Sequence, residues 1–439
     1  MGARETALNV LIACRKEKAW SNGVLKEYVI RDRLDSRDAA LAARLCYGLQ
    51  QNRNKLDFYL KQLLTGKLKD LHPILRDILH MGLYQLYEMD KIPESAAVNE
   101  SVSLAKKYCP KQKFAPGLTN AVLRNAVRSR DTLRQPQRLE DKYSHSPELI
   151  ALLRKSVGED RLEGMLKANN TIPPTVIQVN TRKVTTEELI QKLEAEQVMV
   201  QPHSWMENCL IISNFGNLER LKAFQEGLFY VQDPASKLSV LCAQIPQGET
   251  ISILDCCAAP GGKSFAAAIA AGEKVMITSC DVHSHKIELI QKGADRLGLT
   301  NIHPQLQDAT LDRPEWHNQM DVVLADVPCS GYGIIRKKPD IREKSPASMA
   351  ELPKLQLQIL TKQADYVKPG GLLMYSTCTV LTRENADVVK QFLETRQDFS
   401  LEALPLPEQI RSDSLGMVTL IPGEHDTDGF FICRLRRKA

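Results

Sequence analysis

The chain has 439 residues, 43% of them hydrophobic and 25% charged, and carries a net charge of +5 at pH 7. These values are ordinary for soluble globular proteins, and at about 100–200 residues per domain the length allows several domains. No apolar run reaches the ~18 residues of a membrane helix and no signal-peptide pattern opens the chain, so we expect a cytoplasmic protein with no membrane span.

Residues 1–140 are predicted to form an all-helical bundle. Apolar residues in the segment 70–89 recur at the i, i+3, i+4 spacing of an amphipathic helix, and they are Leu71, Ile74, Leu75, Ile78, Leu79, Leu83 and Leu86. The segment 36–64 has the same period, with Ser36 or Asp38 as its expected N-cap. No strand-like alternation interrupts the region, which favours a compact bundle.

The helical region also holds the excess of positive charge. Residues 1–142 contain 26 Lys and Arg against 16 Asp and Glu, and the part from 101 to 142 contains ten against three. The rest of the chain is net acidic. This asymmetry predicts that the N-terminal part meets a polyanion, although on charge alone a solvated helical face explains it equally well.

A polar linker is expected at 131–145, and a small α+β segment is expected at 146–230. The pattern of the small segment predicts two amphipathic helices and then a strand rich in β-branched residues. Thr185, with Glu188 three residues later, predicts a capping box at the start of the helix that follows. Two further apolar strands, "CLIIS" and "LFYVQD", complete the segment.

Residues 231–439 alternate between apolar strands and amphipathic helices. This alternation predicts a mainly parallel, doubly wound α/β sheet of the Rossmann type. The tail from 417 to 437 instead has the pattern of two antiparallel strands joined by a loop. The predicted fold is therefore multidomain, with an all-α bundle at 1–140, a small α+β segment at 146–230 and an α/β domain at 231–439.

A glycine-containing loop joins the first strand and helix of the α/β domain. It reads "CAAPGGKS" and lacks both the GxGxxG spacing and the Walker spacing, so a nucleoside triphosphate is not expected. Acidic residues end the successive strands, and they are Asp255, Asp281, Asp308 and Asp326. Each alone is explained as a helix N-cap, but together they favour a ligand with hydroxyls, an amine and a sulfonium charge. S-adenosylmethionine has all three.

Two cysteines follow neighbouring strands of the predicted sheet, Cys329 in "ADVPCSGYG" and Cys378 in "YSTC". Parallel strands end at one edge, so both thiols are expected to face one crevice, and a chance pair of core cysteines is the less favoured alternative. Eleven cysteines are present without a CxxC pair, which argues against a zinc site and for reduced thiols. No metal is expected.

The motifs "CAAPGGKS", "DVPCSG" and "STC" resemble those of the RNA cytosine-5 methyltransferases. The resemblance extends to "QDPAS", "KKPDI" and "HDTDGFF". In the N-terminal region, "AAVNESVSLAKKY" and "LTNAVLRN" resemble the RNA-binding antitermination factor NusB. A NusB-like domain joined to this core is similar to the Sun/Fmu family of bacterial 16S ribosomal RNA cytosine-5 methyltransferases, and the match covers nearly the whole chain.

The resemblance implies a role for each site residue. Cys378 is expected to add to C6 of the cytosine as the nucleophile, Cys329 to assist product release, and Asp326 to contact the base. The cofactor is expected to be S-adenosylmethionine, bound by Cys257, Ala258, Ala259, Pro260, Gly261, Gly262, Lys263, Asp281, Asp308 and Asp326. Lys263 either orients a neighbouring carboxylate or lies in solvent at the helix start. The expected partner is RNA, most simply 16S ribosomal RNA, and the protein is expected to be a monomer.

The sequence departs from the family pattern at two places in the small α+β segment. Gln178 stands where the family usually has arginine, and "YSHSPEL" lacks the usual tryptophan. Two other hypotheses stay open, a tRNA cytosine-5 methyltransferase and a non-catalytic RNA-binding assembly factor. DNA cytosine methyltransferases attack with the cysteine of the "PC" motif and lack "STC", and amino methyltransferases place an aromatic residue where Cys329 stands.

Overall fold

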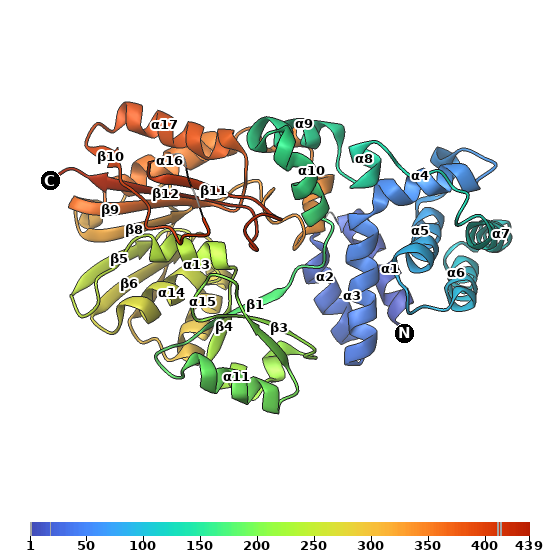
Figure 1. The fold of residues 1–439 in the computed structure, drawn as a ribbon, viewed down its shortest axis with the longest axis horizontal. Coiled ribbons are helices and arrows are strands. Elements are labelled where there is room, and N and C mark those ends of the chain that lie inside the picture. The colour runs from blue at the N-terminus through green and yellow to red at the C-terminus, as the bar shows by residue number, and fades with distance from the viewer. Residues whose placement is uncertain (1, 18, 411, 413–414) are drawn as a thin grey trace. The chain divides into compact units, whose positions relative to one another are not determined.

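A computed structural model describes residues 2–17, 19–410, 412 and 415–439. By its internal contacts the chain divides into two compact units (Figure 1). The first unit comprises Met1–Ala151 together with Ile335–Lys344, and the second comprises Leu152–Ile334 together with Ser345–Ala439.

The first unit is the predicted helical bundle. Its α-helices are α1 (Ala3–Glu17), α2 (Ser21–Arg31), α3 (Ser36–Gln51), α4 (Arg53–Leu63), α5 (Pro73–Glu88), α6 (Glu94–Tyr108), α7 (Ala115–Arg128) and α8 (Leu139–Lys142), with a 3₁₀ turn η1 (Leu68–Asp70). The apolar face predicted in α5 is buried at Leu75, Ile78 and Leu83. This face supplies the burial that stabilises a helix of modest length.

Two expectations about this unit were wrong. The N-cap of α3 is Asp35, whose carboxylate accepts a hydrogen bond from the Asp38 backbone N–H at 2.8 Å, and not Ser36 or Asp38. Aspartate is a strong capping residue, and its choice moves the helix start by one position. The stretch 131–145 is not a simple polar linker, because it contains α8 and ends in the buried residues Ser144 and His145.

The 3₁₀ turn η4 (Pro339–Glu343) belongs to the helical unit although it lies far along the chain. Arg342 is buried, and its guanidinium donates to the carbonyl oxygens of Gln51 at 3.0 Å and Tyr143 at 2.9 Å. Asp340 accepts hydrogen bonds from the Ser21 hydroxyl of α2 at 2.6 Å and from the Gln50 amide of α3 at 2.8 Å. Burial lowers the pKa of the Arg342 guanidinium to about 9. The bundle is therefore completed by a segment that follows Cys329.

The second unit contains a small antiparallel sheet of order β2-β3-β1-β4. Its elements are β1 (Thr175–Val179), α11 (Thr186–Ala195), β2 (Met199–Pro202), β3 (Cys209–Ser213), η2 (Leu218–Arg220), α12 (Lys222–Gln225) and β4 (Phe229–Val231), preceded by α9 (Pro147–Val157), which crosses the unit boundary, and α10 (Glu159–Ala168). The predicted capping box is confirmed, because Thr185 accepts from the Glu188 N–H at 3.2 Å and Glu188 accepts from the Thr185 N–H at 3.0 Å.

The central sheet has the order β10-β12-β9-β8-β5-β6-β7, with β11 paired to β12. Its strands are β5 (Ile251–Asp255), β6 (Val275–Asp281), β7 (Ile302–Leu306), β8 (Met320–Asp326), β9 (Val367–Thr377), β10 (Phe399–Leu401), β11 (Met417–Leu420) and β12 (Phe430–Arg437). Pairing from β7 across to β9 is parallel, and β10, β11 and β12 are antiparallel to their neighbours. The two antiparallel strands expected in the tail are thus confirmed.

Helices cover both faces of the central sheet (Figure 1). One face packs α13 (Pro234–Leu241), α14 (Gly262–Ala271) and α15 (Ser284–Leu297), and the other packs α16 (Leu352–Ala364) and α17 (Ala386–Thr395). Three further 3₁₀ turns are η3 (Pro314–Trp316), η5 (Pro346–Met349) and η6 (Thr382–Glu384). The doubly wound fold that the strand–helix alternation predicts is confirmed.

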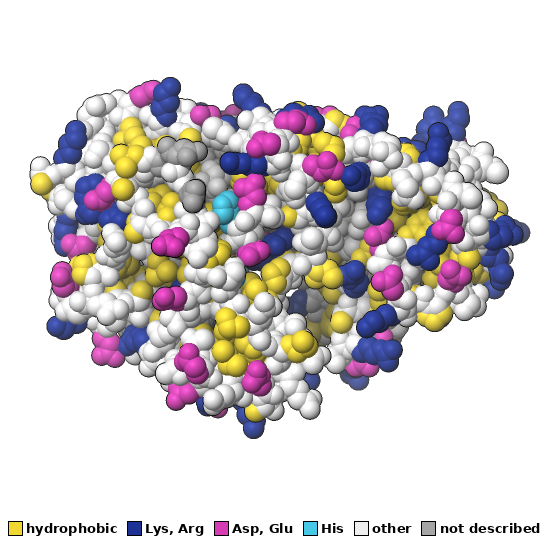
Figure 2. Space-filling model, viewed as in Figure 1, with side chains coloured by type: hydrophobic (Ala, Val, Ile, Leu, Met, Phe, Trp, Pro, Cys, Tyr) yellow, Lys and Arg dark blue, Asp and Glu magenta, His cyan; other side chains and the backbone are white. Residues whose placement is uncertain are grey.

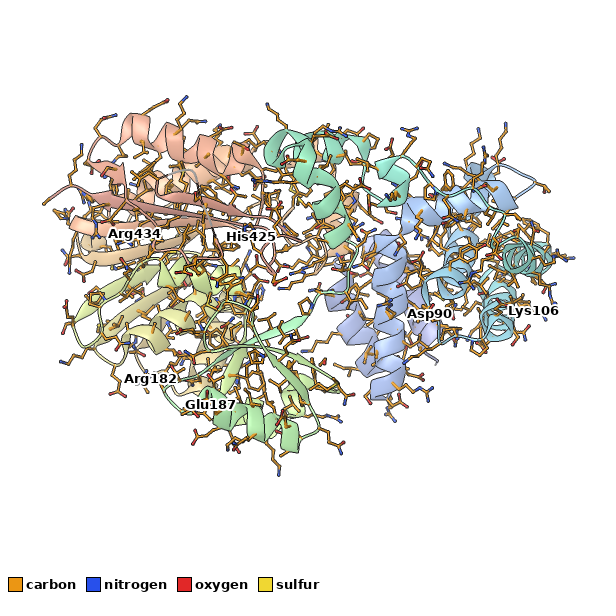
Figure 3. The ribbon with its side chains drawn as sticks, in the orientation of Figure 1. Asp90, Lys106, Arg182, Glu187, His425 and Arg434 are labelled. Carbon is orange, nitrogen blue, oxygen red and sulfur yellow. The ribbon has the colours of Figure 1, made fainter. Side chains whose placement is uncertain are left out.

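Polar contacts join the small sheet to the helices of the central one. The Arg296 guanidinium at the end of α15 donates to the carbonyl oxygens of Phe224 at 2.7 Å and Phe229 at 3.0 Å. Arg182, labelled in Figure 3, forms an ion pair of 2.7 Å with Glu273 after α14. These contacts fix the small sheet beside the helices that follow β5 and β6.

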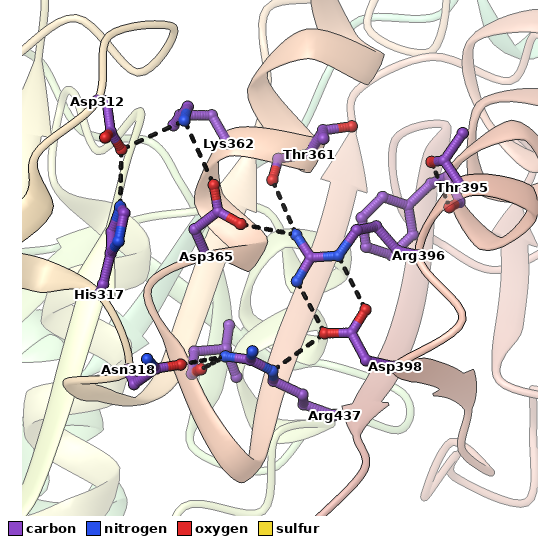
Figure 4. A network of polar contacts seen from close by, with 12 residues as sticks. Asp312, His317, Asn318, Thr361, Lys362, Asp365, Thr395, Arg396, Asp398 and Arg437 are labelled. Carbon is purple, nitrogen blue, oxygen red and sulfur yellow. Dashed lines mark hydrogen bonds and ion pairs between the residues drawn. The ribbon is translucent and has the colours of Figure 1, made fainter.

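Charged side chains form a network at the amino edge of the central sheet, which is the edge where β8 and β9 begin (Figure 4). Arg396 donates to Asp365 at 2.9 Å and to Asp398 at 2.8 Å, and Arg437 contacts Asp398 at 3.1 Å. Lys362 lies 3.2 Å from Asp312 and also contacts Asp365. Each carboxylate of this amino-edge network therefore has a cationic partner.

Candidate active site

The carboxyl edge of the central sheet gathers the predicted site residues. Strands β5, β6 and β8 end at Asp255, Asp281 and Asp326, and Cys378 follows β9 directly. β5 is flanked by β6 on one side and by β8 on the other. The strand connections therefore run from β5 toward β7 in one direction and resume from β8 in the opposite direction. Ligands of doubly wound sheets bind at such a reversal, outside the carboxyl ends of the strands.

The glycine-containing loop after β5 is held by backbone hydrogen bonds. The Ala258 N–H donates to the Cys280 carbonyl at 2.8 Å, and the Gly261 N–H donates to the Ala258 carbonyl at 2.7 Å. Gly261 has a φ of +107°, and a Cβ on it would lie 2.4 Å from the Phe265 ring. Only glycine tolerates both conditions, so this loop brings bare backbone to the start of α14.

The loop and helix α14 form a site that fits an anionic or hydroxyl-rich ligand. Among the described residues, no side chain caps the N-terminus of α14, which leaves its first N–H groups available to a ligand. Asp281 is buried at the end of the next strand, where its carboxylate accepts from the His283 N–H at 3.1 Å. An uncapped helix start beside a buried strand-end carboxylate suits a nucleoside that carries a carboxylate and ribose hydroxyls.

Asp308 lies differently from the other strand-end carboxylates. It follows β7 by two residues, and its carboxylate accepts from the Thr310 N–H at 2.8 Å and from the Thr310 hydroxyl at 2.7 Å. Part of its hydrogen-bonding capacity is therefore used in a local turn, and since no helix begins there Asp308 is not a helix N-cap. It remains half-buried at the same edge as Asp281.

Asp255 is fully buried at the end of β5. Its carboxyl accepts a hydrogen bond from the Ser264 hydroxyl at 2.7 Å, and the hydroxyls of Ser264 and Ser279 are themselves 2.7 Å apart. Burial raises the pKa of the Asp255 carboxyl to about 6, against the opposing effects of the Ser264 hydrogen bond and of Lys263. This carboxyl fixes the first turn of α14 relative to β5 and β6.

Lys263 lies inside the site and not in solvent. Its side chain is 8% exposed, and its ammonium group lies 2.6 Å from Asp326 Oδ2. The ammonium group also donates to the Ser236 hydroxyl at 2.9 Å and lies 5.0 Å from the centre of the Phe430 ring. The other oxygen of Asp326 accepts from the Ser376 hydroxyl at 2.9 Å. Both oxygens of Asp326 are thereby held in place by charged or hydroxyl donors, which fixes the orientation of its carboxyl group.

The structure brings the two predicted cysteines together. The sulfur atoms of Cys329 and Cys378 are 3.0 Å apart, and both are free thiols. The Cys378 carbonyl accepts from the Gly333 N–H at 3.0 Å, which joins the segment after Cys329 to the end of β9. The neighbouring Cys378 thiol, together with burial, raises the pKa of the Cys329 thiol well above its ordinary value. Cys329 and Cys378 lie at the same edge of the sheet as Asp326, since Asp326 pairs with Ser376 across β8 and β9.

Three polar residues of this site were not predicted from the sequence. Ser236 and Ser376 bind Lys263 and Asp326, and buried Glu384 accepts a hydrogen bond from the Ser330 N–H at 2.9 Å. The signals were present, because Ser236 belongs to "QDPAS" and Ser376 to "STC". Glu384 carried no signal of its own, since a glutamate in a short polar stretch reads as a surface residue.

Gln178 stands at the position where the family usually has arginine. It is buried in β1, and its amide donates to the Gln232 carbonyl at 3.0 Å and to the Cys209 sulfur at 3.2 Å. These contacts tie the small sheet to the "QDPAS" segment, whose Gln232 and Ser236 side chains are 3.1 Å apart. The departure at Gln178 therefore affects how the small sheet meets the site.

The basic residues of 101–142 form an exposed surface on the helical unit. All ten are exposed, and they are Lys106, Lys107, Lys111, Lys113, Arg124, Arg128, Arg130, Arg134, Arg138 and Lys142. Figure 2 shows the side chains of Lys and Arg gathered over α6 and α7, and Figure 3 shows Lys106 pointing away from the bundle. Lys107 pairs with Glu5 and Arg138 with Glu140. In the described part of the chain, no helix has the length and apolar character needed to cross a membrane.

Family models match three parts of the chain. One described as 16S rRNA methyltransferase RsmB/F matches residues 242–436, and one described as the NusB family matches residues 1–128. A third, described as the RsmF/B-like ferredoxin-like domain, matches residues 145–219. These matches confirm the predicted organisation of a NusB-like helical domain, a small α+β segment and a Rossmann-like methyltransferase domain.

Individual proteins match over nearly the full length. The probable ribosomal RNA small subunit methyltransferase B of Bacillus subtilis is 36% identical, covering 99% of this chain and 98% of that protein. The ribosomal RNA small subunit methyltransferase B of Vibrio cholerae is 33% identical, covering 92% and 90%.

Solved structures agree with this. The crystal structure of PH0851 has a TM-score of 0.80 and 25% identity, with 98% of each chain covered. The structure of NSun6 from Pyrococcus horikoshii with SFG has a TM-score of 0.58 at 21% identity, covers 67% of this chain and 98% of that one, and supports the fold. Since its relatives are 36% and 33% identical over nearly all of its length, the chain belongs to the ribosomal RNA small subunit methyltransferase B family.

Proposed function

We propose that this protein transfers a methyl group from S-adenosylmethionine to C5 of a cytosine in 16S ribosomal RNA, through a covalent bond between Cys378 and C6. The observation that carries the proposal is the pair of thiols 3.0 Å apart at the sheet edge that also holds the Asp326 carboxylate, which Lys263 and Ser376 orient. Names of the relatives support ribosomal RNA as the substrate. The cytosine, its C5 atom and the covalent step rest on the resemblance of the motifs.

The chemistry explains why two thiols are needed. Cytosine C5 is a weak carbon nucleophile, and addition of the Cys378 sulfur to C6 makes C5 enamine-like. Asp326 contacts the N3 and amino edge of the base and stabilises the adduct. After C5 is methylated, its proton must leave before the bond between C6 and the Cys378 sulfur can break. Cys329, 3.0 Å from Cys378, is placed to assist that release.

The residues of the carboxyl edge fit S-adenosylmethionine. Asp281 would bind the ribose hydroxyls, the loop from Cys257 to Lys263 would approach the amino-acid part with its backbone, and Asp308 would lie at the base end. When bound, the cofactor supplies an electrophilic methyl group on a sulfonium centre. Lys263, itself held by the Ser236 hydroxyl, and Ser376 fix the orientation of the Asp326 carboxylate.

RNA binding is proposed for the exposed basic surface of the helical unit. Lysine and arginine on such a surface bind phosphates, and they make affinity strongly dependent on salt. The thiol can reach C6 only if the base leaves its stack, so the target is expected to be unpaired or flipped. The domains 1–140 and 146–230 would hold RNA while 231–439 catalyses. We also propose that the protein is a monomer, binds no metal and acts in the cytoplasm.

Bisulfite sequencing of 16S ribosomal RNA and of tRNA tests the proposal after incubation of each with the protein and cofactor. We expect one new protected cytosine in 16S RNA, absent when the cofactor is omitted. Protection in tRNA alone would make tRNA the substrate in place of 16S ribosomal RNA and would leave the proposed C5 chemistry unchanged. Methyl transfer from labelled cofactor to RNA without any protected cytosine would reject the C5 chemistry, and no transfer to naked RNA or to small subunits would favour the assembly-factor hypothesis.

A further inference from the structure

A buried carboxyl group binds the backbone next to Cys329 and has no part in the chemistry described above. Glu384, the last residue of η6, is fully buried. Its Oε2 accepts hydrogen bonds from the Ser330 N–H at 2.9 Å and from the Gln356 amide at 3.0 Å. Its Oε1 has no hydrogen-bond partner among the residues that the structure describes. A buried carboxyl group is costly unless it does something that an apolar residue cannot.

The contacts of Glu384 reach both segments that carry the thiols. Ser330 directly follows Cys329, and the Gln356 amide that binds Glu384 also donates to the Pro328 carbonyl at 2.9 Å. The residues before and after Cys329 are thus fixed through one carboxyl group. On the other side, the Glu384 carbonyl accepts from the Tyr375 hydroxyl at 2.6 Å, and Tyr375 lies in β9 three residues before Cys378.

We propose that Glu384 is a positioning residue that holds the backbone on both sides of Cys329 and sets the polar surroundings of that thiol. The inference rests on the proposed function, in which the two thiols have different roles. A thiolate at Cys329 would compete with Cys378 for C6. A Cys329 thiol can instead give its proton to the Cys378 sulfur 3.0 Å away as the bond between C6 and that sulfur breaks, and take up the C5 proton in its place. Glu384 would therefore decide which of two adjacent sulfurs attacks.

The groups that face Cys329 come from each element packed against it. Cys378 and Tyr375 belong to β9, Asp326 ends β8, and Glu384 belongs to η6. Lys263 is the nearby cation, and its ammonium group is bound to Asp326. The Cys329 thiolate is disfavoured by Cys378, by burial, and by Glu384 and Asp326. Together these effects raise the pKa of the Cys329 thiol, as described above. Only Glu384 in this set also binds the backbone next to Cys329.

The first test measures the thiol without any RNA. In a Cys378→Ser background, Cys329 is alkylated with iodoacetamide across a pH series, and its modification is followed by peptide mass spectrometry. Glu384→Gln should shift the midpoint of the Cys329 profile to lower pH by about one unit, which means roughly tenfold faster modification at fixed pH. The matched control is Asp387→Asn, an exposed carboxylate three residues away, which should leave the profile unchanged. Superimposable profiles for Glu384→Gln and its parent would overturn the proposal.

The second test uses the otherwise intact enzyme. Glu384→Gln should lower kcat for methylation by about 10–100-fold, leave KM for RNA unchanged, and accumulate a covalent protein–RNA adduct on denaturing gels, because release is slowed. Glu384→Asp, which keeps the carboxyl group, should restore part of kcat and the parental alkylation profile, and it serves if Glu384→Gln does not fold. A fall in kcat without either adduct or profile change would show a purely structural role. If the alkylation shift occurs but Cys378 proves dispensable for methylation, the proposed function fails and the contact between Glu384 and Cys329 stands.

Discussion

At the amino edge of the central sheet, Asp398 lies between Arg396 and Arg437, and chiefly Arg396 lowers the pKa of its carboxyl to about 2. At the carboxyl edge of the same sheet, burial raises the pKa of the Asp255 carboxyl to about 6. The amino-edge network gives each carboxylate a cationic partner, whereas at the carboxyl edge burial raises the pKa of Asp255, and the neighbouring Cys378 thiol together with burial raises the pKa of Cys329. One edge serves stability, and the other holds perturbed groups of the kind that cluster at functional sites.

A possible cation site at the amino edge illustrates the difference between the two edges. Asp312, His317 and Asp365 at the amino edge are close enough to hold a cation, with ligand atoms within 4.8 Å of one another. The Lys362 ammonium, however, already contacts both carboxylates, and the His317 ring N–H donates to Asp312 at 2.9 Å. An ammonium group between two carboxylates supplies the charge that a metal would bring. The network is therefore read as ion pairing.

Removal of the nucleophile at the carboxyl edge should give the largest effect, a loss of activity without a loss of stability. Cys378→Ala should lower methylation by more than ~10³-fold, the scale on which loss of a nucleophile acts in other covalent enzymes, with unchanged thermal unfolding. Cys14→Ala, which alters a thiol of similar exposure in the helical unit, is the control and should stay active. A fully active Cys378→Ala variant would remove Cys378 from the mechanism.

The release step gives a large effect of a different kind. Cys329→Ala should leave Cys378 able to attack but unable to depart, so a covalent protein–RNA complex should accumulate and run as a slow band on a denaturing gel. The band should require cofactor and disappear in the double variant with Cys378→Ala. If good substrate yields no band, Cys329 has no role in release.

Loss of the oriented carboxylate should cost less. Lys263→Met removes the ion pair with Asp326, and loss of a charge-assisted hydrogen bond of about 1.5–3 kcal/mol corresponds to a roughly 10–100-fold fall in kcat/KM. Steady-state kinetics with saturating cofactor measure it. An unchanged kcat/KM would return Lys263 to the role of a helix-start residue.

The buried carboxyl of Asp255 should affect stability with a defined sign. Its folded pKa is raised above the ordinary value, so its stabilising contribution is full below pH ~4 and is lost as pH rises to about 6. Asp255→Asn should therefore raise the free energy of unfolding by about 1–3 kcal/mol at pH 8, with no gain near pH 4. Urea unfolding at the two pH values measures this, and a variant less stable at pH 8 would contradict the sign.

The smallest effect is expected at the amino edge. The folded pKa of Asp398 is lowered, so its contribution is present above pH ~4 and disappears as pH falls toward 2. Asp398→Asn should lose about 1 kcal/mol or less at pH 7, because the side chain is 37% exposed and solvent screens the pair. Methylation well below the melting temperature should not change. A large loss of kcat would break the proposed separation between the two edges.

Features set by local pattern were predictable from the sequence, and features set by distant partners were not. Thr185 and Glu188 predicted their capping box, and the strand pattern placed Cys329 and Cys378 at one edge, because periodicity and turn chemistry act over a few residues. Glu384 could not be placed, since its partner Ser330 lies 54 residues away. The cap at Asp35 was missed by one position for a smaller reason, that three neighbouring polar residues are all competent caps.

The position of Arg342 along the chain has a consequence for synthesis. Its acceptors, the carbonyl groups of Gln51 and Tyr143, leave the ribosome long before the arginine does. At ~5–20 residues per second, the interval between residue 151 and residue 335 lasts roughly 10–40 s. During that time the nascent helical bundle lacks one buried side chain, while strands β5 to β8 are still being made. The N-terminal unit is thus synthesised first but is completed only when residues 335–344, in the last third of the chain, have been made.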